Sequence, residues 1–147
     1  MQVSTKMAYM SMIIFLEKFY LQTYSDDLGG ILSDLPLLSD GASADPAALY
    51  DWSKAVHSVK LDDVSAKGSN QEEFLTNLEA YDALCVFLQE YVNKTYSPNI
   101  ERLVQDLVGA KKVLSGNSLL SLWNTTVDFV QKNPEVAREM VAFKLFM

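Results

Sequence analysis

The chain has 147 residues, of which 49% are hydrophobic and 21% charged, and its formal net charge at pH 7 is −7. This length and composition predict one globular domain and exclude an intrinsically disordered chain. The acidic balance argues against direct binding to nucleic acid or to an anionic membrane, and it favours a basic protein as the partner.

The first predicted element is a helix that begins after Ser4 or Thr5 and ends near Thr23. Apolar residues recur along it at helical spacing and fill most positions between, which is typical of a helix at the centre of a bundle. Its apolar stretch, residues 7–16, is shorter than the roughly 20 residues that cross a bilayer, and it lacks a charged leader and a cleavage site. Because a single cysteine also excludes an internal disulfide, we expect a cytoplasmic protein.

A second helix is predicted between Ser25, its N-cap, and Pro36, which ends it. Inside it, Gly29 and Gly30 each cost about 1 kcal/mol relative to alanine. We therefore expect another helix or a partner to approach closely at these glycines. A loop over residues 37–44 follows.

A third helix is predicted to begin with Asp45 as N-cap and Pro46 in its first position. Its apolar stripe runs from residue 49 to residue 59 and includes Trp52, which we expect in the core.

Residues 80–107 repeat residues 8–35 without a gap, and nine of the 28 aligned positions are identical. Such self-similarity indicates an internal duplication of about 70 residues. We expect the first helices of the two copies to pack together as a core pair about a pseudo-twofold axis. The third helix recurs 71 residues later, with the matched pairs Leu49/Leu120, Trp52/Trp123 and Val56/Val127.

The sequence therefore predicts an all-α fold, a single-domain helical bundle of about six to eight helices built from a duplicated three-helix unit. No stretch of useful length alternates apolar and polar residues, so no sheet is expected. A final helix after Asn133-Pro134 has no copy in the first half and is expected to cover an exposed seam. The predicted segments are repeat 1 over residues 5–60, a linker over 61–70, repeat 2 over 71–132, with 71–78 leading helically into it, and a C-terminal helix over 134–146.

No group of residues predicts an enzyme. The only histidine, His57, lacks the neighbours of a helical metal site, and Cys85 lies on an apolar stripe without an adjacent base. We interpret His57 as a surface or half-buried structural residue and Cys85 as core. No cysteine and histidine cluster, calcium loop or glycine-rich phosphate loop is present, so no catalytic residue, metal site or cofactor is predicted.

The carboxylates are the most informative residues. No lysine or arginine occurs between Lys18 and Lys54, whereas that interval holds six aspartates. Helix capping is a sufficient reason for some of them, because helix N-termini favour carboxylates. Capping does not account for Asp34, Asp40 and Asp51, nor for the absence of lysine and arginine from the interval. A negative surface for a basic protein is the functional interpretation.

Aromatic residues flank these acids, and aromatic anchors beside charges are typical of interface hot spots. We expect Tyr24 and Tyr50 to be exposed. The predicted partner-binding residues are Tyr24, Asp26, Asp27, Asp34, Asp40, Asp45, Tyr50 and Asp51.

The run Ser25-Asp26-Asp27-Leu28-Gly29 after an aromatic-rich helix, followed by residues 44–48, ADPAA, and Trp52, resembles the immunity proteins of bacterial contact-dependent growth inhibition systems. The resemblance covers about a third of the chain. It implies a small cytoplasmic protein that binds a cognate toxin domain and blocks it, and such toxins are often nucleases with basic active sites. The second copy has Ser97-Pro98-Asn99 in place of the acidic run, which indicates that the first copy carries the partner surface.

The resulting hypothesis is a non-enzymatic immunity protein that occludes the active site of a basic toxin domain, a ribonuclease, with acids that stand in for phosphates. The expected partner is that toxin, with no nucleic acid, membrane or small-molecule substrate. The alternative is a helical adaptor or regulatory module with a non-toxin partner. An immunity gene lies directly after a toxin gene, so gene order separates the two.

Overall fold

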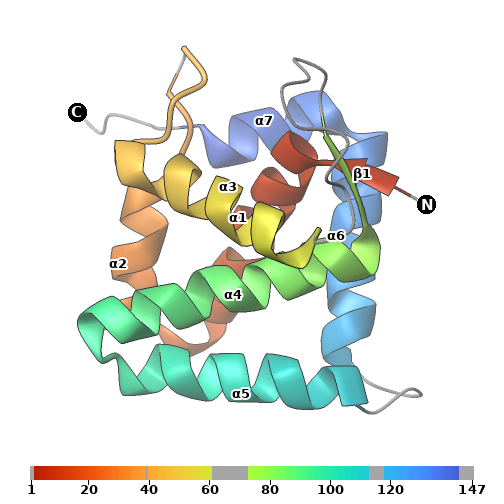
Figure 1. Cartoon of the computed structure of the whole chain (residues 1–147). Helices are drawn as coiled ribbons and strands as arrows, with labels where there is room; N and C mark the ends of the chain where they lie inside the picture. The colour runs from red at the N-terminus through yellow and green to blue at the C-terminus, as the bar shows by residue number, and fades with distance from the viewer. Residues whose placement is uncertain (1, 39, 61–72, 113–117, 143–147) are drawn as a thin grey trace.

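The computed structural model describes residues 2–38, 40–60, 73–112 and 118–142 (Figure 1). Over these residues the chain forms a single all-α domain with seven helices and one small sheet, which confirms the predicted fold class. The elements are β1 (Gln2–Ser4), α1 (Thr5–Thr23), α2 (Asp26–Asp34), α3 (Pro46–Val59), β2 (Phe74–Thr76), α4 (Asn77–Thr95), α5 (Pro98–Lys112), α6 (Ser118–Lys132) and α7 (Pro134–Val141).

Most helices begin where the sequence predicts. The side chains of Ser4, Ser25 and Asp45 accept hydrogen bonds from backbone N–H groups in the first turns of α1, α2 and α3. The ends of the two long helices also match, since Tyr24 after α1 and Tyr96 after α4 both take the left-handed conformation, with φ of 50° and 57°. The two copies thus turn from the first helix into the second in the same way.

The small sheet was not predicted, and it lies on the pseudo-twofold axis. β1 pairs antiparallel with β2, and Val3 is opposite Leu75, the residue 72 positions later that corresponds to it in the second copy. Each strand has three residues, too few to show an alternating pattern. The predicted helix over residues 71–78 is therefore wrong from residue 74 to 76, and Thr76 instead caps α4 in a capping box with Glu79.

The two copies exchange their third helices. α3 packs mainly on α4 and α6 packs mainly on α1, whereas α1 and α4 make only a limited contact with each other. The prediction that α1 and α4 form the core pair is thus corrected. The tryptophan of each third helix contacts a phenylalanine of the other copy, with ring centroids 6.3 Å apart for Trp52 and Phe87 and 5.4 Å for Trp123 and Phe15. Both tryptophans are buried, as expected for Trp52.

Two buried tyrosines tie the first helix of each copy to the end of the second. Tyr9 donates a hydrogen bond to the carbonyl oxygen of Leu35 at 2.6 Å, and Tyr81 donates to that of Leu107 at 2.6 Å. Burial raises the pKa of both hydroxyls, so each remains a donor at any ordinary pH. The duplication therefore preserves polar contacts as well as the apolar stripe.

Only the first glycine of α2 has a close neighbour. A Cβ atom on Gly29 would lie 3.0 Å from Cε1 of Tyr20 in α1, so of the two expected causes of close approach another helix is the one observed there. A Cβ atom on Gly30 would lie 3.7 Å from the hydroxyl of Tyr91, an ordinary van der Waals distance, so the structure shows no close approach at Gly30.

The last helix, α7, packs on α1 and α6, which agrees with a role in covering a seam. It ends at Val141, five residues before the predicted end, because Ala142 leaves the helix and forms a bridge with Leu37. The N–H group of Leu37 also donates to the carbonyl oxygen of Val141 at 2.9 Å. The predicted linker over residues 61–70 and the helical residues predicted after 142 lie outside the described part of the chain.

Candidate functional site

The residues predicted to bind a partner come from the turn before α2, from α2 itself, from the loop that follows it and from the first half of α3. Figure 1 shows the start of α2 beside the C-terminal end of α4 and the beginning of α5, and the loop after α2 at the other end of that helix, beside α7. All eight predicted residues are exposed or half-buried, so each has some surface available. We call this region the acidic end.

At the start of α2, the two neighbouring aspartates have different environments. Asp26 is exposed, and its carboxylate makes no hydrogen bond or ion pair with another described residue. Asp27 is half-buried and accepts hydrogen bonds from Ser97 Oγ at 2.7 Å and Asn99 Nδ2 at 3.3 Å. Asp27 therefore helps to join α2 to α5, which leaves Asp26 as the freer of the two acids.

At the other end of α2, Asp34 lies close to Asp45. The N–H group of Asp45 donates to the carbonyl oxygen of Asp34 at 3.0 Å, and its side chain accepts from the N–H group of Ala47. Burial and, to a smaller degree, the charge of Asp45 raise the pKa of the Asp34 carboxyl. Burial also raises the pKa of Tyr91, with further contributions from Asp34 and Asp27. The charges that raise these two pKa values are carboxylates, and no cation of the described residues is among the causes.

Asp40 and Asp51 are the remaining two of the six aspartates that were predicted to bind a partner. Asp40 is exposed and accepts a hydrogen bond from the N–H group of Ala42 in its own loop. Asp51 pairs with Lys94 of α4 at 3.2 Å and with Lys54 at a longer 3.8 Å. The interval that lacks bases in the sequence thus receives one base, Lys94, from the second copy, which a linear sequence cannot show.

Tyr24 and Tyr50 are exposed as expected, at 70% and 64%. The structure adds a tyrosine that sequence reasoning missed, because Tyr96 is 84% exposed and follows α4 as Tyr24 follows α1. The sequence contains a signal for this tyrosine, because the tripeptide Thr-Tyr-Ser occurs both at residues 23–25 and at residues 95–97. Large exposed aromatic side chains near acids are the usual anchors of a protein interface.

Groups for covalent chemistry are not assembled in the described part of the chain. His57 is exposed, and burial, reinforced by Asp82, raises the pKa of the half-buried Cys85 thiol to about 12, although Lys111 opposes the shift. This thiol stays protonated and unreactive at neutral pH. Among residues 2–38, 40–60, 73–112 and 118–142, no three His, Cys, Asp or Glu side chains are placed to hold a metal ion. No helix in the same ranges is long and apolar enough to cross a membrane.

The acidic end can therefore attract a positively charged surface and hold it through exposed tyrosines. Among the described residues of this end, no histidine, cysteine or lysine adjoins the predicted partner-binding side chains other than Lys54 and Lys94 beside Asp51. No protein-family model, curated protein or solved structure matches the chain.

Proposed function

We propose that the chain is an immunity protein, which binds a cognate bacterial toxin domain, a basic ribonuclease, and covers the active site of that domain with its acidic end. The observation that carries the proposal is a set of exposed or half-buried carboxylates, three of which have no basic partner among the described residues. Asp26, Asp34 and Asp40 make no ion pair with any other described residue. The resemblance of the run from Ser25 to Gly29 supports the choice of a toxin as partner.

The inhibition follows from charge and shape. A ribonuclease binds the phosphates of its substrate with cationic side chains, and free carboxylates at Asp26, Asp34 and Asp40 take the place of those phosphates. Complementary charge accelerates association, reaching about 10⁸–10⁹ M⁻¹s⁻¹ at low salt in favourable complexes. Tyr24 and Tyr50 add apolar contact area, which slows dissociation.

The test is to co-express this chain with the toxin domain encoded by the gene directly upstream. We expect the two proteins to co-purify as one complex and this chain to abolish the toxicity and nuclease activity of that domain. An upstream gene without a toxin domain, or a toxin that is neither bound nor inhibited, would contradict the proposal and favour an adaptor.

A matched pair of variants then locates the interface. One variant carries Asp26→Asn, Asp34→Asn and Asp40→Asn. The control removes the same number of charges from the first half of α4 and from α6. We expect the first variant to associate at least about tenfold more slowly at low salt and with a weaker salt dependence, because steering depends on local charge. Equal effects of the two variants would mean that net charge, not the acidic end, controls binding. The control substitutions are Glu79→Gln, Asp82→Asn and Asp128→Asn.

A further inference from the structure

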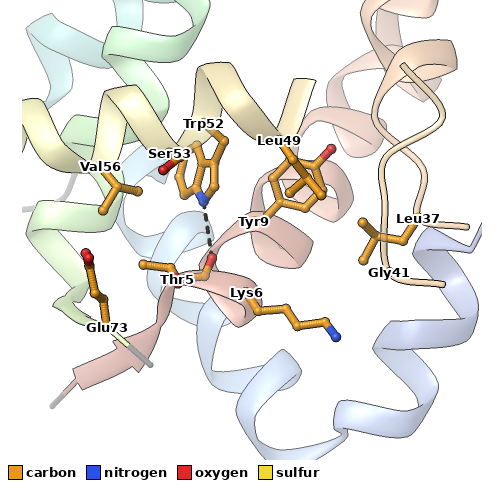
Figure 2. Close-up of a pocket in the computed structure, with 10 residues that line it drawn as sticks. All are labelled: Thr5, Lys6, Tyr9, Leu37, Gly41, Leu49, Trp52, Ser53, Val56 and Glu73. Atoms are coloured by element: carbon orange, nitrogen blue, oxygen red, sulfur yellow. Dashed lines mark hydrogen bonds between the residues drawn. The ribbon is translucent and has the colours of Figure 1, made fainter. Parts of the chain in front are cut away.

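Two pockets of the structure differ in how much apolar surface a partner can reach. Figure 2 shows the larger one, of about 390 Å³, which lies between the start of α1 and α3. Its wall contains Tyr9, Trp52 and Val56, and each of these side chains is at most 3% exposed. They belong to the core and offer almost no surface to a ligand.

The smaller pocket, of about 240 Å³, lies between the end of α1, the start of α2 and α5. Two of its apolar lining residues, Leu28 and Ile100, are buried, whereas Phe19 and Leu103 are half-buried and keep apolar surface open to solvent. Small-molecule sites usually have volumes of roughly 300–1,000 Å³. A pocket below that range suits a single side chain of a protein partner, of the kind that anchors an interface.

Internal contacts hold this smaller pocket in shape. The ring of Phe19 packs edge-on against that of Phe15, with centroids 5.0 Å apart, and Thr23 Oγ1 donates to the carbonyl oxygen of Phe19 at 3.0 Å. The hydrogen bond from Asn99 to Asp27 joins α5 to α2 beside the pocket. Because the walls are formed in the free protein, a partner does not have to order them on binding.

The charges around the pocket favour a cationic occupant. The segments that form it, residues 19–28 and 99–106, contain four carboxylates and one cation, Arg102. Arg102 and Asp106 both line the pocket, and both are exposed. Neither makes an ion pair with the other or with another described residue. Asp106 is therefore available to a positive charge from a partner.

We propose that this pocket receives one arginine side chain of the toxin domain, an inference that rests on the proposed function. The methylene groups of that arginine cover Phe19 and Leu103, and its guanidinium group pairs with Asp106. Arginine fits better than lysine, because a guanidinium group is planar and also stacks on aromatic rings such as that of Phe19. Since Asp106 belongs to α5, the partner surface extends from the first copy onto the second.

The experiment measures the dissociation rate of the toxin complex for three single variants of the full chain. Asp106→Asn should raise this rate at least about tenfold, because it leaves the guanidinium group without its partner. Arg102→Gln should lower the rate, because it removes a like charge beside the guanidinium group. The matched control is Glu101→Gln, which removes a carboxylate from the same helix but outside the pocket lining. It should change the rate less than about twofold.

A second measurement identifies the arginine. Each arginine of the toxin domain is replaced by glutamine, and its complexes with the unmodified chain and with Asp106→Asn are compared. At one arginine the replacement should make Asp106→Asn silent, since the two substitutions then remove the same interaction. Urea denaturation checks that the three variants of this chain stay folded, which is expected because all three side chains are exposed.

Three results would overturn the inference. Equal effects of Asp106→Asn and Glu101→Gln would mean that the pocket holds no cation. Faster dissociation of Arg102→Gln would mean that an acidic side chain occupies it. The absence of any toxin arginine coupled to Asp106 would exclude the proposed pair. All three leave the proposed function standing if the unmodified chain binds and inhibits the toxin, whereas a toxin that is not bound would contradict both.

Discussion

The first helices of the two copies, α1 and α4, have related sequences but different surroundings. In α1 every residue from 8 to 16 is buried, whereas α4 keeps half-buried positions between its buried ones. Met10 of α1 is 2% exposed, while the corresponding residue of α4, Asp82, pairs with Lys111 at 2.8 Å. α7 packs on α1, and the duplicated units supply no second copy of it. Among the described elements, α7 thus covers α1 and has no counterpart on α4.

The same comparison explains why the acidic run differs between the copies. Asp27 and Asn99 are 72 positions apart, so they correspond to each other, and they meet in a hydrogen bond of 3.3 Å where α2 packs on α5. Two aspartates at this contact would repel each other. The contact with Asp27 therefore favours a neutral residue at position 99. This reason is separate from the prediction that only the first copy carries the partner surface. Proximity to the pseudo-twofold axis forces the two copies to diverge.

The largest expected effect comes from exchanging the residues that distinguish α1 from α4. Met10→Asp places a carboxylate in the core and should cost about 3–5 kcal/mol or prevent folding, because a buried unpaired charge is not compensated. Asp82→Met removes only a surface ion pair and should change the free energy of unfolding by less than about 1 kcal/mol. Urea denaturation measures both. Similar losses for the two variants would show that α1 and α4 are equally covered.

A smaller effect is expected at the contact between Asp27 and Asn99. Asn99→Asp should lower the free energy of unfolding by about 1 kcal/mol at pH 7, because two partly exposed carboxylates then face each other. The loss should shrink near pH 3, where carboxyl groups take up protons. Adding Asp27→Asn to this variant restores one amide and one carboxylate and should recover most of the stability. Without that recovery in denaturation curves, the contact would not be the reason for the divergence.

Local signals in the sequence predicted the helices well, because each is set by a few neighbouring residues such as Ser25, Asp45-Pro46 or Pro98. Contacts between elements that are distant in the sequence were harder to predict. The alignment identified equivalent residues, but it could not tell whether α3 would pack on α1 or on α4. The bridge from Lys94 to Asp51 depends on that exchange and was missed for the same reason. The β1 and β2 strands, at three residues each, leave no periodic pattern.

The smallest effect concerns Asp34 and its counterpart Asp106. Because the pKa of Asp34 is raised in the folded protein, the native state binds its proton more tightly than the unfolded state does. This contribution stabilises the fold below the ordinary value of 3.8 and is lost as pH rises through the folded-state pKa. At pH 7 the ionised Asp34 therefore opposes folding, and its place at the C-terminus of α2 adds an unfavourable interaction with the helix dipole.

Asp34→Asn should raise the urea midpoint at pH 7, and the gain should vanish near pH 3. Asp106, which is exposed, is the control, and Asp106→Asn should leave both midpoints unchanged. A lower midpoint for Asp34→Asn at pH 7 would mean that this carboxylate stabilises the fold, and the acidic end would then be built around it and not merely available to a partner.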